Sequence, residues 1–109
     1  MYRIGKEELD EIAKLFETRK MFRANSTLRE VENLEAEWAA LVGVRYAVCM
    51  SGGTPALISA LVGLEIGPGD EVIVPGYTFM ASALAVLAVG AIPVIAEVDE
   101  TLSLDPEDV

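Results

Sequence analysis

The stretch that decides the fold is VRYAVCMSGGTPAL, residues 44–57. Its first half is a short apolar run, which predicts a buried β-strand over residues 44–50. Its last residues open a predicted helix over about residues 55–64, with Pro55 in the first turn, where a missing N–H group costs little. The turn between them, residues 51–54, lies at the carboxyl end of a strand, which is where open α/β sheets bind ligands.

This turn has the features of an anion-binding site. Its two glycines let the backbone approach a ligand closely, and the first N–H groups of the following helix point toward it. Thr54 adds a hydroxyl donor, whereas Pro55 removes a backbone donor, so we expect an anion to be held by Gly53, Thr54 and Ala56. Neither a Walker lysine nor the third glycine of the dinucleotide fingerprint is present. A ligand-free turn capped by threonine would need the same residues, so spacing alone leaves both interpretations open.

The residues that follow repeat the alternation of strand and helix. The predicted elements are a strand over 71–75, a helix from 78 or 79 to 89 that ends at Gly90, and a strand over 92–98. The order β-α-β-α-β with continuous apolar strands predicts an α/β fold with a parallel sheet. Both helices are apolar on nearly every face, so we expect them to be covered by a further domain or by a second subunit.

The first 43 residues are more charged and have helical periodicity. They predict one helix over about residues 6–20 and a second that ends at Gly43. Ser26 or Thr27 is the predicted cap of the second helix, with Glu30 completing a capping box with Thr27. We therefore divide the chain into an N-terminal helical segment, 1–43, and a partial α/β domain, 44–109. Asp105-Pro106 resembles a helix start, so we expect the chain to be cut from a longer protein.

Composition excludes several functions. The formal net charge is −10 and histidine is absent, so nucleic acid and membrane surfaces are not expected partners. No histidine or ordered set of acids predicts a metal site. Cys49 is the one cysteine, and its apolar surroundings predict a buried, inert thiol in a protein of the reducing cytoplasm.

Other side chains are candidates for ligand contact. The aromatic segment PGYTF, residues 75–79, follows the predicted strand over 71–75, where a ring could lie over a planar ligand or pack in the core. Glu97 and Asp99 end the next strand, and they could bond to a ligand or cap a turn. Arg23 and Asn25, between the first two helices, could approach an active site or lie in a solvated loop.

Three segments in order carry a resemblance to a known family: YAVCMSGGTPAL at 46–57, GPGDEVIVPGYTF at 67–79 and GAIPV at 90–94. From about Glu30 onward the chain resembles the DegT/DnrJ/StrS sugar aminotransferases. The resemblance implies the aspartate aminotransferase fold, of which these residues would form the N-terminal part of the large domain that binds pyridoxal 5′-phosphate (PLP). It implies that Gly53 and Thr54 hold the PLP phosphate and that Phe79 stacks on the pyridine ring. Pro55 stands where the family usually has alanine or serine, at a position that contacts the phosphate in such enzymes, so the resemblance makes Pro55 the fourth predicted cofactor-binding residue beside Gly53, Thr54 and Phe79.

The resemblance also implies an activity. Such enzymes are homodimers that move an amino group from glutamate or glutamine to a keto-sugar, often nucleotide-linked, or to a keto-cyclitol. The family's Schiff-base lysine and the aspartate that pairs with the pyridine nitrogen would lie beyond residue 109, so no catalytic residue is expected here. The early lysines fall before the α/β segment and do not replace it; these are Lys6, Lys14 and Lys20. We expect the 109-residue chain alone to be inactive.

Two alternatives stay open. One is a relative that lacks the lysine and acts as a sugar dehydratase or a regulatory protein. The other is a small phosphate-binding α/β module that is complete in itself. The acceptor substrate cannot be named from these residues, because specificity residues in such enzymes are spread over later segments and the partner subunit.

Overall fold

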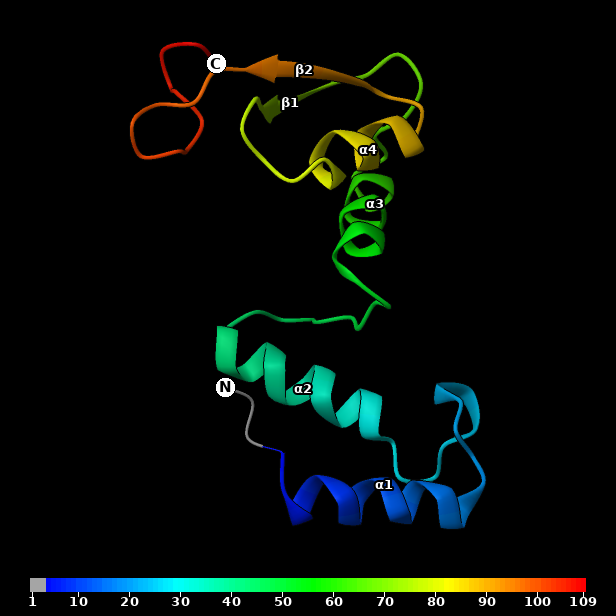
Figure 1. Ribbon diagram of the computed structural model, residues 1–109. Coiled ribbons are helices and arrows are strands. Elements are labelled where there is room, and N and C mark those ends of the chain that lie inside the picture. The colour runs from blue at the N-terminus through cyan, green and yellow to red at the C-terminus, as the bar shows by residue number, and fades with distance from the viewer. Residues whose placement is uncertain (1–3) are drawn as a thin grey trace. The chain divides into compact units, whose positions relative to one another are not determined.

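The computed structural model describes residues 4–109, which form two compact units (Figure 1). The first unit extends to Cys49, and the second is Met50–Val109. Each unit is internally packed and is described by itself.

The first unit is helical. It contains α1 (Lys6–Thr18), the short 3₁₀ helix η1 (Arg23–Asn25) and α2 (Glu30–Val42). Glu7 and Glu8 lie in the first turn of α1, where negative charge complements the helix dipole. Gly43 ends α2 with a φ of 79°, a left-handed conformation that glycine adopts without strain. Both helices lie where the sequence predicts them, to within a few residues at each end.

The cap of α2 differs from the predicted capping box. The hydroxyl of Ser26 accepts hydrogen bonds from the N–H groups of Leu28 and Arg29, each at 3.3 Å. The same hydroxyl pairs with the carboxylate of Glu30, the first residue of the helix. The predicted Thr27–Glu30 box is therefore wrong. The N-cap residue is Arg29, which is left-handed and makes no side-chain bond to the helix, so the helix starts three residues beyond Thr27 and Ser26 bonds within the turn that precedes it.

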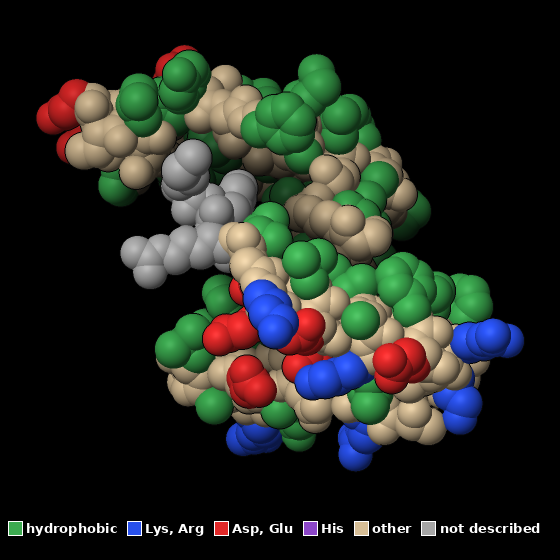
Figure 2. All heavy atoms as spheres, turned by 60° about the horizontal axis from the view of Figure 1, so that its bottom comes forward, with side chains coloured by type: hydrophobic (Ala, Val, Ile, Leu, Met, Phe, Trp, Pro, Cys, Tyr) green, Lys and Arg blue, Asp and Glu red, His purple; other side chains and the backbone are tan. Residues whose placement is uncertain are grey.

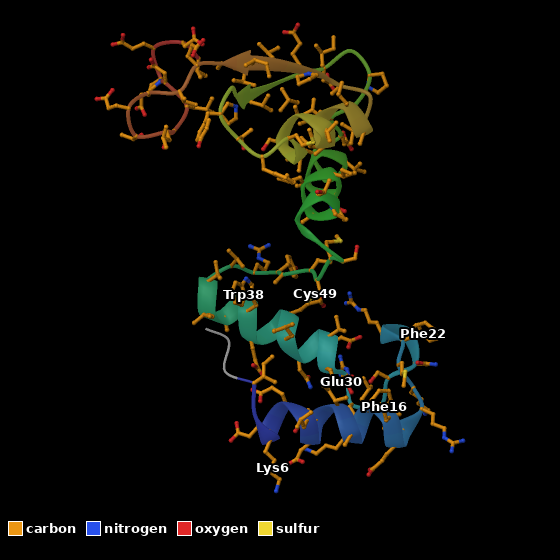
Figure 3. The ribbon with its side chains drawn as sticks, in the orientation of Figure 1. Lys6, Phe16, Phe22, Glu30, Trp38 and Cys49 are labelled. Atoms are coloured by element: carbon orange, nitrogen blue, oxygen red, sulfur yellow. The ribbon has the colours of Figure 1, made fainter. Side chains whose placement is uncertain are left out.

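Residues 44–50 are not a strand in the structure, so the first of the three predicted strands is wrong. Within residues 4–109 this segment has no ladder partner. Its backbone makes two hydrogen bonds to α2: the Val44 N–H group donates to Ala39 O at 3.0 Å, and the Cys49 N–H group donates to Glu35 Oε1 at 2.8 Å. An apolar run favours extended backbone, but a strand forms only where a neighbour supplies paired groups. Cys49 is also exposed, contrary to the expected buried thiol, because no sheet encloses it (Figure 3).

The second unit contains a parallel two-stranded sheet. Its elements in chain order are α3 (Gly53–Gly63), β1 (Glu71–Pro75), α4 (Ala81–Ala88) and β2 (Ile92–Ala96). The strands pair with Ile73 opposite Val94. Helix α4 connects them and packs against both, and α3 packs against α4 (Figure 1). Val74, Val86 and Ala91 form the buried core of this unit. The predicted α-β-α-β part of the order is confirmed, with the last strand ending at Ala96.

The helices of the second unit leave much apolar surface exposed. No residue of α3 is buried, and large side chains such as Leu57 and Val62 lie open to solvent. On the face shown in Figure 2, lysine and arginine side chains lie on the first unit, while apolar side chains dominate the second. This exposure agrees with the expectation that α3 needs further cover. None of the helices within residues 4–109 combines the length and hydropathy needed to cross a membrane.

The acids after β2 are used in turns. Asp99 Oδ1 accepts hydrogen bonds from the hydroxyl and the N–H group of Thr101, and Asp108 Oδ2 accepts from the N–H group of Glu97 at 2.8 Å. An isolated antiparallel bridge joins Val98 to Leu104. Asp105 Oδ1 accepts from the N–H group of Glu107, so the predicted helix start is a turn in the structure. The hydroxyl of Thr101, followed by its N–H group, holds the pKa of Asp99 below the ordinary 3.8.

Two glycines with positive φ offer a matched test of what ends the helices. Gly43→Ala adds a Cβ in open space, so only the left-handed backbone is strained, at a cost of about 1–2 kcal/mol. Gly90→Ala adds the same strain, and its Cβ also lies 3.1 Å from Pro68 Cγ. We expect the Gly90 variant to lose more stability in urea unfolding of the purified protein. Gly63→Ala, a control with neither problem, is expected to lose no stability, since alanine favours a helix more than glycine does. Equal losses for the Gly43 and Gly90 variants would contradict the contact with Pro68.

The turn at Asp99 makes a second prediction. Because the folded pKa is depressed, the turn's stabilisation is present above the unfolded pKa and is lost as pH falls through the folded value. Thr101→Val removes the hydroxyl donor, so the pKa of Asp99 should rise toward 3.8, as read from the carboxyl ¹³C shift across an acid titration. Ser103→Ala is the control, because the Ser103 side chain makes no hydrogen bond to Asp99. An unchanged pKa in the Thr101 variant would show that the hydroxyl is not the cause.

Candidate functional site

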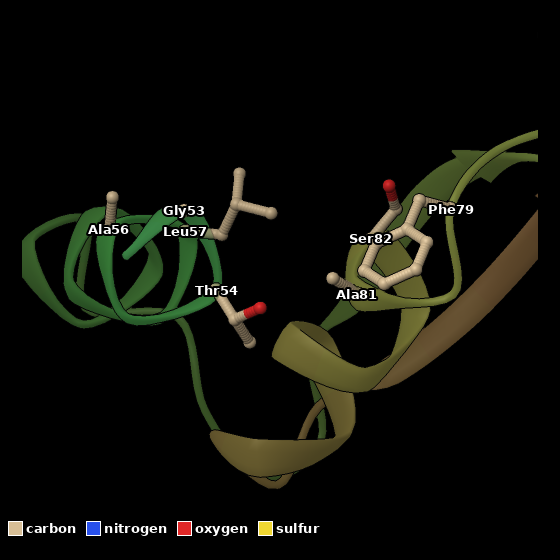
Figure 4. Close-up of a pocket in the computed structure, with 7 residues that line it drawn as sticks. All are labelled: Gly53, Thr54, Ala56, Leu57, Phe79, Ala81 and Ser82. Atoms are coloured by element: carbon tan, nitrogen blue, oxygen red, sulfur yellow. The ribbon is translucent and has the colours of Figure 1, made fainter. Parts of the chain in front are cut away.

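Three of the four predicted cofactor-binding residues line one cavity of the second unit. Gly53, Thr54 and Phe79 contribute to a cavity of about 540 Å³ (Figure 4). The other lining residues are Ala56, Leu57, Ala81 and Ser82. Pro55, the fourth predicted residue, is not among them. A cavity of this volume is in the range that accommodates small-molecule ligands.

The α3 side of the cavity supplies hydrogen-bond donors. The first backbone bond of α3 runs from the Ala56 N–H group to Gly52 O, at 3.2 Å. The amides of Gly53 and Thr54 precede it and therefore have no acceptor within the helix. Ala56, expected to donate to an anion, is instead engaged in the helix. The donors left to a ligand are two amides and the half-buried hydroxyl of Thr54.

Phe79 forms the opposite side. It lies between β1 and α4, its side chain is 79% exposed, and Figure 4 shows its ring across the cavity from Thr54. The loop before it is held at both ends. The Gly76 N–H group donates to Ala96 O at 2.8 Å and so extends the β1–β2 ladder, and the Ser82 N–H group donates to Phe79 O at 3.1 Å. The ring is thus carried by a loop whose position follows from the sheet.

Ser82 is a lining residue that the sequence argument did not propose. It lies in the first turn of α4, and its hydroxyl pairs with that of Thr78 at 3.0 Å. The sequence could have indicated Ser82 as a lining residue, because it is the only polar side chain in an otherwise apolar helix. Among residues 4–109, no charged side chain lines the cavity. The arrangement therefore joins a polar end, made of neutral donors with a helix dipole behind them, to an apolar and aromatic end.

The other candidates lie elsewhere and have structural partners. Arg23 pairs with the carboxylate of Glu35, and Asn25 Oδ1 accepts from the Phe22 N–H group at 3.3 Å. Glu97 and Asp99 belong to the turns after β2. Lys14 pairs with Glu11 on α1, at 2.6 Å. These residues do not line the cavity, so its chemistry rests on donors, an aromatic ring and apolar walls.

Comparisons with known proteins match this chain to a family and to solved structures. The sequence profile of the DegT/DnrJ/EryC1/StrS aminotransferase family matches residues 3–109. A relative from Acidithiobacillus ferrooxidans, UDP-N-acetyl-3-dehydro-alpha-D-glucosamine 3-aminotransferase, is 61% identical over 67 residues, which are 62% of this chain and 18% of the relative.

Two solved structures share the fold. The crystal structure of 3-amino-5-hydroxybenzoic acid synthase superposes with a TM-score of 0.91 at 36% identity, covering 97% of this chain and 27% of that one. NtdA from Bacillus subtilis, solved with bound cofactor PMP, superposes with a TM-score of 0.84 at 30% identity, covering 93% of this chain and 22% of that one.

The chain spans about a fifth to a quarter of the length of these proteins. The family match extends over nearly all of it, and the aminotransferase neighbours confirm the predicted fold class. The resemblance predicted from three short motifs is likewise confirmed, and the chain belongs to the DegT/DnrJ/EryC1/StrS aminotransferase family.

Proposed function

We propose that the protein containing this chain is a PLP-dependent aminotransferase. It moves an amino group from glutamate or glutamine to a keto-sugar, often nucleotide-linked, or to a keto-cyclitol. The observation that carries the proposal is the cavity that brings the amides of Gly53 and Thr54 opposite the ring of Phe79. A relative named for a UDP-linked dehydro-sugar and a structural neighbour solved with PMP support the substrate class and the cofactor.

The lining residues fit PLP. Its phosphate is an anion, and the two free amides and the hydroxyl at the start of α3 are suitable donors for it. Phe79 offers an exposed aromatic face for the pyridine ring. The side chains of Leu57 and Ala81 give apolar walls between these ends. Pro55 lacks an N–H group and does not line the cavity, so we assign it the start of the helix rather than a contact with the cofactor.

PLP, when bound, supplies the electron sink that amino transfer requires, and this chain would supply residues that bind it. Gly53 and Thr54 would hold its phosphate, and Phe79 would stack on its ring. Leu57 and Ala81 would contact it between these ends. We assign no proton transfer to this chain, and we propose that the Schiff-base lysine and the carboxylate partner of the pyridine nitrogen are supplied by residues beyond 109.

We further propose that the protein is a cytoplasmic homodimer. The support for a dimer is the apolar surface of α3, where Leu57, Val62 and Leu64 are exposed. The support for the cytoplasm is the single cysteine in the 109 residues.

The main test compares the full-length protein with the 109-residue chain. The full-length protein should bind PLP and, with glutamate or glutamine, aminate a nucleotide-linked keto-sugar, as followed by mass spectrometry. The 109-residue chain should show neither the absorbance of lysine-bound PLP nor turnover. Loss of water from the sugar in place of amination would favour a dehydratase. A compact, exchange-protected monomer of 109 residues would favour a self-contained phosphate-binding module.

The role of the ring has a matched control. In the full-length protein, Phe79→Leu removes the stacking face and should weaken PLP binding about fivefold, since aromatic stacking contributes on the order of 1 kcal/mol. Tyr77→Leu removes an exposed aromatic residue of the same loop that does not line the cavity, and it should leave PLP affinity unchanged. Titration of the apoenzyme with PLP, followed by fluorescence, measures both. Equal effects of the two substitutions would contradict the stacking role.

A further inference from the structure

A pair of hydroxyl groups encloses the aromatic residue of the cavity. Thr78 Oγ1 and Ser82 Oγ lie 3.0 Å apart, and Phe79 is the cavity-lining aromatic residue between them in sequence. The pair lies at the surface, where water can satisfy either hydroxyl, so it contributes little to the stability of the fold. Its main effect is on the geometry of the short stretch of chain that it closes.

The position of the Phe79 ring has to come from the backbone that carries it. A ring that stacks on a ligand must leave one face open, so the protein cannot pack against that face. The side chain turns about only two torsions, each with a few preferred values, so a fixed backbone leaves the ring few positions. Figure 4 shows the result, with Phe79 and Ser82 on one side of the cavity and Thr54 on the other.

Three bonds restrain this backbone within the second unit. The Gly76 N–H group donates to Ala96 O at 2.8 Å and holds the start of the loop on the sheet. The Ser82 N–H group donates to Phe79 O at 3.1 Å and closes the turn that leads into α4. The bond between the Thr78 and Ser82 hydroxyls crosses the same turn one residue earlier, so it spans the backbone on both sides of Phe79.

We propose that Thr78 is a positioning residue for cofactor binding: through its hydroxyl bond to Ser82 it holds the Phe79 ring at the cavity. This proposal rests on the proposed function. Thr78 does not line the cavity, so it acts through the ring and not by contact with the ligand. Threonine suits the role because its branched side chain has few rotamers, which keeps the hydroxyl in place. The N-cap residue of α4 is Met80, which has no side-chain oxygen to cap the helix.

The test measures PLP affinity of the full-length apoprotein by titration. Thr78→Val keeps the shape of the side chain and removes the hydroxyl, so it should weaken PLP binding about threefold, a loss in the range of one neutral hydrogen bond. Thr78→Ser keeps the hydroxyl and should restore wild-type affinity. In a Phe79→Leu background, Thr78→Val should have no further effect, because the ring that it positions is gone. Equal losses in the two backgrounds would show a purely structural role and overturn the proposal.

A second readout needs no cofactor. In the apoprotein, hydrogen exchange followed by mass spectrometry reports on the Ser82 amide through the peptide that spans residues 77–84, since this amide donates to Phe79 O. Thr78→Val should speed exchange of this peptide about threefold, and Thr78→Ser should not. Unchanged exchange in the valine variant would show that the hydroxyl pair does not restrain the turn.

Two further variants separate the possible causes. Thr101→Val is the matched control, because it makes the same chemical change in a turn that does not line the cavity, and it should leave PLP affinity unchanged. Ser82→Ala removes the other hydroxyl of the pair and should weaken binding at least as much as Thr78→Val. A loss in Ser82→Ala with wild-type affinity in Thr78→Val would mean that Ser82 contacts the ligand itself, which overturns the proposal.

Failure of the proposed function has a different signature. A wild-type full-length protein that does not bind PLP overturns that function, and with it the role of Thr78 in cofactor binding. Wild-type binding of PLP together with wild-type affinity in Thr78→Val overturns only the positioning role.

Discussion

The parallel pairing of β1 with β2 is the constraint on which the candidate site depends. The paired strands place α4 across them and bury Val74, Val86 and Ala91 between helix and sheet. The ladder extends past the last strand residue through the bond from Gly76 to Ala96 O. That bond determines where the loop carrying Phe79 leaves the sheet. The aromatic side of the cavity is therefore a consequence of strand register, and a shift in pairing would move the ring away from α3.

The other side of the cavity depends on the start of a helix rather than on a sheet. Its donors exist because the first N–H groups of any helix lack partners, and the sequence places glycine and threonine there. The two sides are complementary in chemistry. One offers polar groups without formal charge, and the other offers an exposed ring. Together the two sides fit a ligand that joins an anion to a planar ring, which restricts the class of ligand more than either side does alone.

Sequence patterns predicted those elements whose bounds are determined by residues close to them in the sequence. The bounds of α1, α2 and β1 follow from periodicity and from turn residues, and Gly43 and Gly90 end helices as expected. Predictions failed where a partner distant in sequence decides the outcome. Residues 44–50 have the composition of a strand, but a strand needs a neighbour. Glu35 was visible as a break in a stripe, but its partners lie 12 and 14 residues away in sequence, where no pattern connects them.

The candidate site residues also divide into those that nearby sequence predicts and those that depend on distant partners. Gly53, Thr54 and Phe79 could be proposed because they lie at the ends of elements, and they line one cavity; their contact with a cofactor stays a prediction. Ser82 was missed because its place depends on how α4 faces α3. The expectation that Ala56 donates to an anion was wrong because α3 begins at Gly53, two residues earlier than predicted, so Ala56 lies past the free N–H groups of the helix start and makes the first bond of the helix.

The consequence is a site with few donors: two amides and a hydroxyl are fewer than a phosphate can accept. With so little binding energy available from this turn, its conformation before the ligand arrives becomes decisive, because a flexible turn must also lose conformational entropy on binding. The proline in the first turn of α3 adds to this constraint, because it leaves one N–H group fewer at the end of the helix that lines the cavity.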